Sequence, residues 1–132
     1  MSKYKNNKVS RIIGNDIYIF DSQLEAKYFD KLVLKLKSGQ IERLIPQPEF
    51  VLQESVKVAT NKTKQGYTTL KAIKYIADFK FIENGKTIVV DAKGFETDVY
   101  KLKKKLFIAK MGDFGVDEFR EAFKSQEIIY KG

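Results

Sequence analysis

Two aspartates and a lysine in the second half of the chain are the side chains best suited to chemistry. Asp78 and Asp91 flank a segment centred on Asn84-Gly85, and Lys93 follows Asp91 by two residues. Carboxylate oxygens suit hard cations such as Mg²⁺ or Mn²⁺. A lysine beside them can hold a water or a phosphate oxygen, or stabilise charge that develops in a reaction. These residue types indicate a metal site if the fold brings them together.

A β-hairpin would bring the two aspartates together. Asn84-Gly85 is the strongest short hairpin signal in the sequence. With a symmetric two-residue turn there, Asp78 faces Asp91, and facing Cβ atoms lie only about 5 Å apart. Because side chains alternate between the two faces of a ribbon, each face has a predicted set. One face would carry Asp78, Lys80, Asp91 and Lys93, and the other Phe79, Phe81, Ile88 and Val90.

The same pattern has a purely structural explanation. Charges are ordinary on the solvated face of an antiparallel sheet, where Lys80 and Lys93 would neutralise the two aspartates. Facing carboxylates repel each other, however, and a bridging divalent cation would remove that repulsion. Gly94, directly after Lys93, fits either a plain turn or a strand end that admits a ligand closely. The register alone leaves both explanations open.

Composition limits the chemistry that this chain can perform. The sequence of 132 residues contains no Cys and no His, which excludes disulfides, thiolate metal sites and the commonest general base. A hydrophobic content of 43% suffices for the core of one domain, predicted to span residues 1–132. The net charge of +8 favours a polyanionic partner, although Lys-rich surfaces also serve solubility alone.

The N-terminus and the hydropathy pattern indicate a cytoplasmic protein. Residues 1–7 form a polar, basic arm, and the N-terminal segment lacks the apolar core of a signal peptide. No run is long and apolar enough to span a membrane. We therefore expect no membrane partner.

Alternating strands and helices must position the candidate residues. Strands are predicted at 8–13, 16–20, 41–52, 70–81, 88–91 and 127–130, and helices at 21–37, 97–111 and 116–123. Pro46 and Pro48 make the 41–52 segment an edge or irregular strand. Residues 53–69, polar and Lys-rich, are interpreted as a mobile loop with strand character near 56–59. The predicted fold class is α/β, with a mixed β-sheet flanked by helices.

The residues around the expected hairpin resemble a known nuclease signature. Ile76-Ala77-Asp78, a hairpin and then Val90-Asp91-Ala92-Lys93 resemble the PD-(D/E)xK motif, with Ala77 in place of the Pro. Glu25 on the preceding helix, the Gln47-Pro48 strand and the basic helix around Tyr100 agree with the same superfamily. Its members include small phage endonucleases, Holliday-junction resolvases and transposon end-cutting nucleases. The resemblance covers residues 20 to 111 and implies a restriction-endonuclease-like core.

The resemblance also implies a role for each residue of the signature. Asp78 and Asp91 would bind Mg²⁺, for which Mn²⁺ could substitute, with the Ala92 backbone carbonyl as a further ligand. Lys93 would position or activate the attacking water, or stabilise charge on the phosphate. Glu25 would bind the metal directly or through water.

Several of these residues have a structural explanation as well. Ser22-x-x-Glu25 is a capping box, in which Glu25 would accept from the Ser22 backbone N–H. The Lys-rich helix could carry a solvated face opposite Leu102, Leu106 and Ala109, or contact phosphates beside the site. Gln47 could be a surface residue, and Tyr100 could pack or stack. The predicted DNA-binding residues are Gln47, Tyr100, Lys101, Lys103, Lys104, Lys62 and Lys64.

The sequence thus predicts a Mg²⁺-dependent endodeoxyribonuclease that hydrolyses phosphodiester bonds by in-line attack of water. The small domain and the phage-like segments favour branched DNA, as in Holliday-junction resolution during recombination. A junction cutter must act on two strands, so a homodimer is expected, encoded by a phage or prophage and acting in a bacterial host. The alternatives are a catalytically silent nucleic-acid-binding protein on the same fold, and a protein-interaction module that does not bind DNA.

Overall fold

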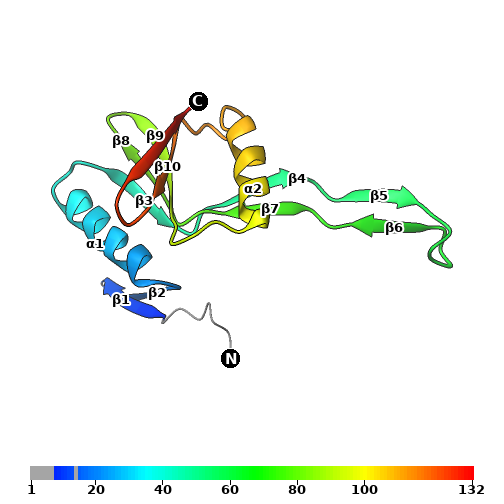
Figure 1. The fold of residues 1–132 in the computed structure, drawn as a ribbon, viewed down its shortest axis with the longest axis horizontal. Helices are drawn as coiled ribbons and strands as arrows, with labels where there is room; N and C mark the ends of the chain where they lie inside the picture. The colour runs from blue at the N-terminus through cyan, green and yellow to red at the C-terminus, as the bar shows by residue number, and fades with distance from the viewer. Residues whose placement is uncertain (1–7, 14) are drawn as a thin grey trace.

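The computed structural model describes residues 8–13 and 15–132, in which one mixed β-sheet lies between two helices (Figure 1). The helices are α1, Gln23–Lys37, and α2, Asp98–Ala109. In this part of the chain, neither helix has the length and apolarity that a membrane crossing requires. The strands are β1 Val9–Ile13, β2 Asp16–Phe20, β3 Glu42–Pro46, β4 Glu49–Gln53, β5 Val56–Ala59, β6 Tyr67–Leu70, β7 Ile73–Ile76, β8 Phe79–Glu83, β9 Lys86–Ala92, β10 Glu118–Ala122 and β11 Glu127–Lys131. The α/β class with a mixed sheet is confirmed, whereas the predicted arm 1–7 lies outside the described residues.

The central sheet has the strand order β11-β10-β9-β8-β3. Strands β9 and β10 run parallel, and the other neighbouring pairs run antiparallel. Parallel neighbours need a crossover connection, which α2 supplies between β9 and β10. Strand β3, which ends at Pro46, lies at the edge of this sheet, as its proline predicts.

The β8–β9 hairpin has the register predicted from Asn84-Gly85. Phe79 pairs with Val90, and Glu83 pairs with Lys86. Asn84 and Gly85 have φ values of 54° and 76°, the positive values that a tight hairpin turn of this sequence requires. The regular pairing ends at Phe79. Asp78 remains attached through its backbone N–H, which donates to the Val90 carbonyl at 3.1 Å.

The two helices pack against opposite faces of the sheet through two separate cores. One core joins α1 to the apolar face of the hairpin, where Phe79 stacks on Phe29 with ring centroids 5.8 Å apart. The other core joins α2 to the opposite face, where Phe107 meets Phe119 at 5.3 Å. Side chains alternate along a strand, so β9 contributes Val90 to the first core and Val89 to the second. The sheet is therefore covered on both sides.

Residues 53–69 contain two paired strands, so their interpretation as a loop throughout is wrong. Strands β5 and β6 pair antiparallel, from Val56 with Leu70 to Ala59 with Tyr67. They extend the β4–β7 pair into a two-stranded arm that projects from the rest of the molecule (Figure 1). Val and Thr residues favour strands, and here they outweigh the polar, Lys-rich composition. The strand character predicted at 56–59 is confirmed.

The helix predicted at 116–123 is also wrong, because this segment contains strand β10. The apolar spacing of Val116, Phe119 and Phe123 resembles a helical period. In the structure, β10 lies between β9 and β11. The adjacent residues Glu121 and Ala122 point to opposite faces of the strand, and both are buried. A strand paired on both sides and buried on both faces loses the alternating pattern that would identify it.

Helix α1 offers a matched test of the first core. Leu32 is 2% exposed and Leu34 is 68% exposed, so Leu→Ala changes the same atoms at both positions of one helix. Leu32→Ala should lower the free energy of unfolding by about 2–5 kcal/mol. Leu34→Ala should change it by no more than about 0.5 kcal/mol. Urea denaturation followed by circular dichroism measures both, and equal losses would contradict the packing of α1.

Candidate metal centre

The end of the hairpin brings Asp78, Asp91 and Lys93 together. The Lys93 ammonium lies 3.1 Å from Asp91 Oδ1, and the Ala92 backbone N–H donates to Asp78 Oδ2 at 2.6 Å. Asp91 is only 1% exposed, because α2 and β7 cover its side of the sheet. The explanation by charges on a solvated face is therefore wrong for Asp91. A buried carboxylate requires a compensating positive charge or hydrogen bonds.

The two carboxylate oxygens of Asp91 have different surroundings. The Tyr75 hydroxyl donates a hydrogen bond to Oδ2. Burial, and next the charge of Asp91, raise the pKa of Tyr75, so that hydroxyl keeps its proton. Oδ1 is buried and has no hydrogen-bond donor among the described residues. Lys93 faces it as an ion pair without hydrogen-bond geometry. The lone pairs of Oδ1 are therefore available to coordinate a cation.

Asp78 is held in an environment that disfavours its charge. Burial first, and then the charges of Asp91 and Glu25, raise the pKa of Asp78 to about 9, against the opposing effects of the Ala92 N–H and Lys93. Ionising two neighbouring carboxylates costs free energy where solvent screening is weak. A divalent cation between them would reverse this preference, because it is the largest local charge in any site that holds it.

Glu25 occupies the first turn of α1, where it has a capping role. The Ser22 hydroxyl accepts from the Glu25 N–H at 3.2 Å, and Glu25 Oε2 accepts from the Asp21 N–H at 3.3 Å. The capping box therefore forms with the N–H of Asp21 in place of the expected Ser22. Burial raises the pKa of Glu25; the charge of Lys93 lowers this pKa, and that of Asp91 raises it. Within residues 8–13 and 15–132, no three acidic side chains converge closely enough to hold a metal.

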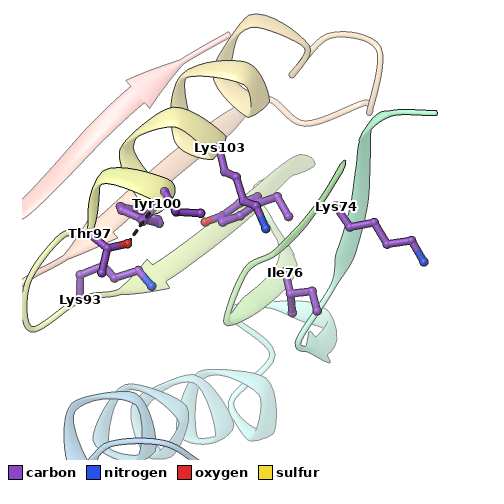
Figure 2. Close-up of a pocket in the computed structure, with 8 residues that line it drawn as sticks. Lys74, Ile76, Lys93, Thr97, Tyr100 and Lys103 are labelled. Carbon is purple, nitrogen blue, oxygen red and sulfur yellow. Dashed lines mark hydrogen bonds between the residues drawn. The ribbon is translucent and has the colours of Figure 1, made fainter. Parts of the chain in front are cut away.

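Lys93 lines two clefts, one on each side of it. The first, of about 280 Å³, lies between β7 and the start of α2, and Lys93, Tyr100 and Lys103 border it (Figure 2). The second, of about 300 Å³, lies against the N-terminus of α1 and is lined by Glu25, Ala92 and Lys93. An anion entering either cleft would meet the Lys93 ammonium.

A buried polar network supports Lys93 from α2 and β10. The Lys93 ammonium lies 4.4 Å from the centre of the Tyr100 ring, within range of a cation–π interaction. The Tyr100 hydroxyl donates to Glu121 at 2.7 Å. Glu121 is 1% exposed and also accepts from Lys104 at 3.2 Å and from Tyr130 at 2.9 Å. This network fixes the ring against which Lys93 rests.

The residues predicted to bind DNA are distributed over three regions. Lys101 is exposed and Lys103 borders the first cleft, whereas Lys62 and Lys64 are exposed at the tip of the arm. Gln47 is exposed at the turn between β3 and β4, and its N–H donates to the Asp78 carbonyl at 2.8 Å.

Two expectations about α2 need correction. Lys104 is directed inward, where its ammonium pairs with Glu96 at 3.0 Å and with Glu121 at 3.2 Å. Its charge is therefore used within the protein. Leu102 and Ala109 are exposed, and Tyr100 and Phe107 are the buried residues of the helix. The packed face of α2 is thus rotated from the one that the leucines suggested.

Sequence reasoning missed Tyr75 and Glu121. Tyr75 belongs to β7, which pairs with β4 outside the central sheet. Its contact with Asp91 depends on how the arm joins the hairpin, for which the sequence carries no local signal. Glu121 was hidden because its segment was interpreted as a helix, whose spacing would not have directed it at Tyr100.

The chain belongs to the family described as "Protein of unknown function (DUF1064)", which it matches over residues 1–127. No curated protein matches it. Among solved structures it is similar to "Crystal structure of SSO0001", with 17% sequence identity and a TM-score of 0.34. The alignment covers 83% of this chain and 52% of that one, so the chain spans about half the length of that structure. At this level, the similarity carries no argument about function.

The surroundings of Asp78 predict how stability depends on pH in EDTA. Its pKa is higher in the folded protein than in the unfolded chain, so the folded state gains stability from the bound proton at low pH. That contribution is lost as pH rises from about 4 towards about 9, by at most about 1.4 kcal/mol per pH unit.

The side chain of Asp78→Asn cannot lose a proton. The unfolding free energy of this variant, relative to wild type, should therefore increase from pH 5 to pH 8. Urea denaturation at both values measures the difference in unfolding free energy. The exposed Asp113→Asn is the control and should show no such trend. A constant difference for Asp78→Asn would contradict the raised pKa.

Proposed function

We propose that this protein is a metal-dependent endodeoxyribonuclease of the PD-(D/E)xK type. One observation carries the proposal: a buried Asp91 oxygen without a hydrogen-bond donor, beside a second aspartate with a raised pKa and a lysine at 3.1 Å. Carboxylates arranged to disfavour their own charge are typical of sites that take a cation. The finer fold assignment, a restriction-endonuclease-like core, belongs to the same proposal.

Mg²⁺, or Mn²⁺ in its place, fits a donor set made only of oxygens. Asp91 Oδ1 and Asp78 would hold it, with the Ala92 carbonyl as a further ligand. When bound, the metal supplies positive charge that offsets the phosphate and makes a water more acidic. The Tyr75 hydroxyl holds Oδ2 of Asp91 and thereby fixes the direction of Oδ1.

Lys93 and Glu25 would serve the substrate and the water. Lys93 is half-buried, with its side chain 28% exposed, and can direct its ammonium to the phosphate or to the attacking water. Glu25 lines the same cleft as Lys93 but does not form a three-carboxylate group with the aspartates. Its role is therefore to bind the metal through water, with its capping hydrogen bond holding it in place.

We propose branched DNA, such as a Holliday junction formed in recombination, cut by a homodimer in a phage-infected or prophage-carrying cell. A single small domain with basic clefts beside the site binds backbone phosphates without reading base sequence. The preference for a junction rests on the resemblance to phage resolvases.

A catalytically silent DNA-binding protein is the second candidate, and one observation favours it. The carboxylates already have partners within the protein, namely the Tyr75 hydroxyl, the Ala92 N–H and the Lys93 ammonium. In that case the aspartates only fix the end of the hairpin, and metal is unnecessary. Cleavage assays separate the two candidates.

The proposed centre predicts Mg²⁺-dependent nicking of supercoiled plasmid that stops in EDTA. Asp91→Asn and Lys93→Met should each lower the rate by at least about 100-fold, because each removes a charge that the transition state needs. Asp113→Asn and Lys86→Met are matched controls at exposed sites and should retain wild-type rates. No Mg²⁺-dependent nicking by the wild type would overturn the proposal in favour of a silent binder. Full activity of Asp91→Asn would show that any cleavage does not use the proposed centre.

The substrate proposal predicts a preference for branched over linear DNA. The wild-type protein should cut a synthetic four-way junction at least about tenfold faster than a linear duplex made from two of the same strands. Light scattering during size-exclusion chromatography should give twice the mass of one chain. Equal rates on both DNAs, with a monomer in solution, would remove the junction from the proposal while leaving the nuclease intact.

A further inference from the structure

The outer half of the arm, β5 and β6, lies outside both cores of the protein. All four residues of β5 are exposed, and in β6 only Thr68 is half-buried. No residue of either strand belongs to the two hydrophobic clusters. An isolated two-stranded ribbon is only marginally stable in water. Because β5 and β6 do not pack into either core, burial within the protein does not explain why the ribbon is present.

Most of the positive charge on the arm is not paired with acidic side chains. Between Ser55 and Ala77 the sequence has five lysines and no acidic residue, namely Lys57, Lys62, Lys64, Lys71 and Lys74. Lys74 lies 3.7 Å from Glu49 at the base. In the described part of the chain, no carboxylate pairs with the other four. Such a surface is complementary to a polyanion.

The shape of the arm selects among polyanions. The major groove of a B-form duplex is about 12 Å wide and admits a two-stranded β-ribbon. At about 3.3 Å per residue, the stretch from the buried Leu52 to Thr60 at the tip extends about 25 Å, the length of about seven base pairs. Threonine hydroxyls, at Thr60, Thr68 and Thr69, add donors for phosphate oxygens.

The arm also connects directly to the candidate centre. Strand β6 leads into β7, whose Tyr75 donates to Asp91. The first cleft, with Lys93 and Lys103, opens beside β7 (Figure 2). DNA seated at the centre would therefore pass along the base of the arm.

We propose that the β5–β6 arm is a duplex-binding arm that lies in the major groove of the DNA next to the cleavage centre. This inference rests on the proposed function, since it takes DNA as the substrate. Lys62 and Lys64 at the tip, and Lys71 after β6, bind the flanking phosphates. The half-exposed Val56, Val58 and Leu70, which share one face, meet the floor of the groove, where thymine methyl groups are exposed.

Binding to a 30-base-pair duplex in EDTA tests the arm without any cleavage. The full-length variant Lys62→Gln/Lys64→Gln/Lys71→Gln should bind at least about tenfold more weakly than wild type at 100 mM salt. The slope of log affinity against log salt should fall by about two to three. The control Lys37→Gln/Lys86→Gln/Lys131→Gln removes the same charge from exposed sites away from the arm. It should change affinity by less than about threefold.

A second variant tests the groove itself. Replacing residues 56–70 by Asn-Gly leaves the β4–β7 pair and both cores in place, and its melting temperature shows whether it folds. Wild-type protein should protect guanine N7 atoms, which face the major groove, from methylation by dimethyl sulfate. The shortened variant should not protect them.

Four outcomes would overturn or separate the claims. Wild-type affinity in both arm variants would overturn the proposal. So would arm variants that bind DNA normally but turn a dimer into a monomer, because the arm would then join two copies of the chain. If wild type never nicks DNA but its duplex binding depends on the arm, the proposed nuclease fails and the arm stands. Nicking with arm-independent binding gives the reverse result.

Discussion

The close approach of a buried carboxylate, Asp91, and a half-buried one, Asp78, at the end of the β8–β9 hairpin is the constraint on which the rest of the structure depends. The charge of Asp91, which is 1% exposed, disfavours the charge of Asp78, and such an arrangement persists only if the surroundings enforce it. Tyr75, Lys93 and the Ala92 N–H each offset part of the cost. Together these contacts do not fully compensate the negative charge of both aspartates. This uncompensated charge is the physical basis for proposing a cation.

The two cores make the arrangement possible because they hold the hairpin from both sides. Alternation along β9 places Val90 against α1 and Val89 against α2, so the strand that carries Asp91 cannot shift without disrupting both. Glu121 extends this support through Tyr100 to Lys93. A lysine needs such support to hold its ammonium in one position, since its side chain has several rotatable bonds. The buried polar network is thus part of the candidate site although it touches no substrate.

Local signals allowed the hairpin and the helices to be predicted, whereas long-range packing hid the rest. Asn84-Gly85 fixes the register because a two-residue turn allows only one pairing, and Ser22 marks the start of α1 because its hydroxyl caps the helix. Strand β10 was mistaken for a helix because burial on both faces removes its alternation. Tyr75 could not be assigned to the site, since its position depends on a strand pair outside the central sheet.

The inner and outer ends of the arm meet opposite physical demands. Tyr75 on β7 is 3% exposed and anchors a buried carboxylate, whereas β5, at the outer end of the same ribbon, is fully solvated. Rigid anchoring at one end allows the other to project without a core, because pairing with β4 fixes the direction in which β7 leaves the body. A duplex held by the arm would consequently be held at a fixed distance from Asp91. Positioning of this kind, more than added affinity, is what an in-line displacement at one phosphate requires.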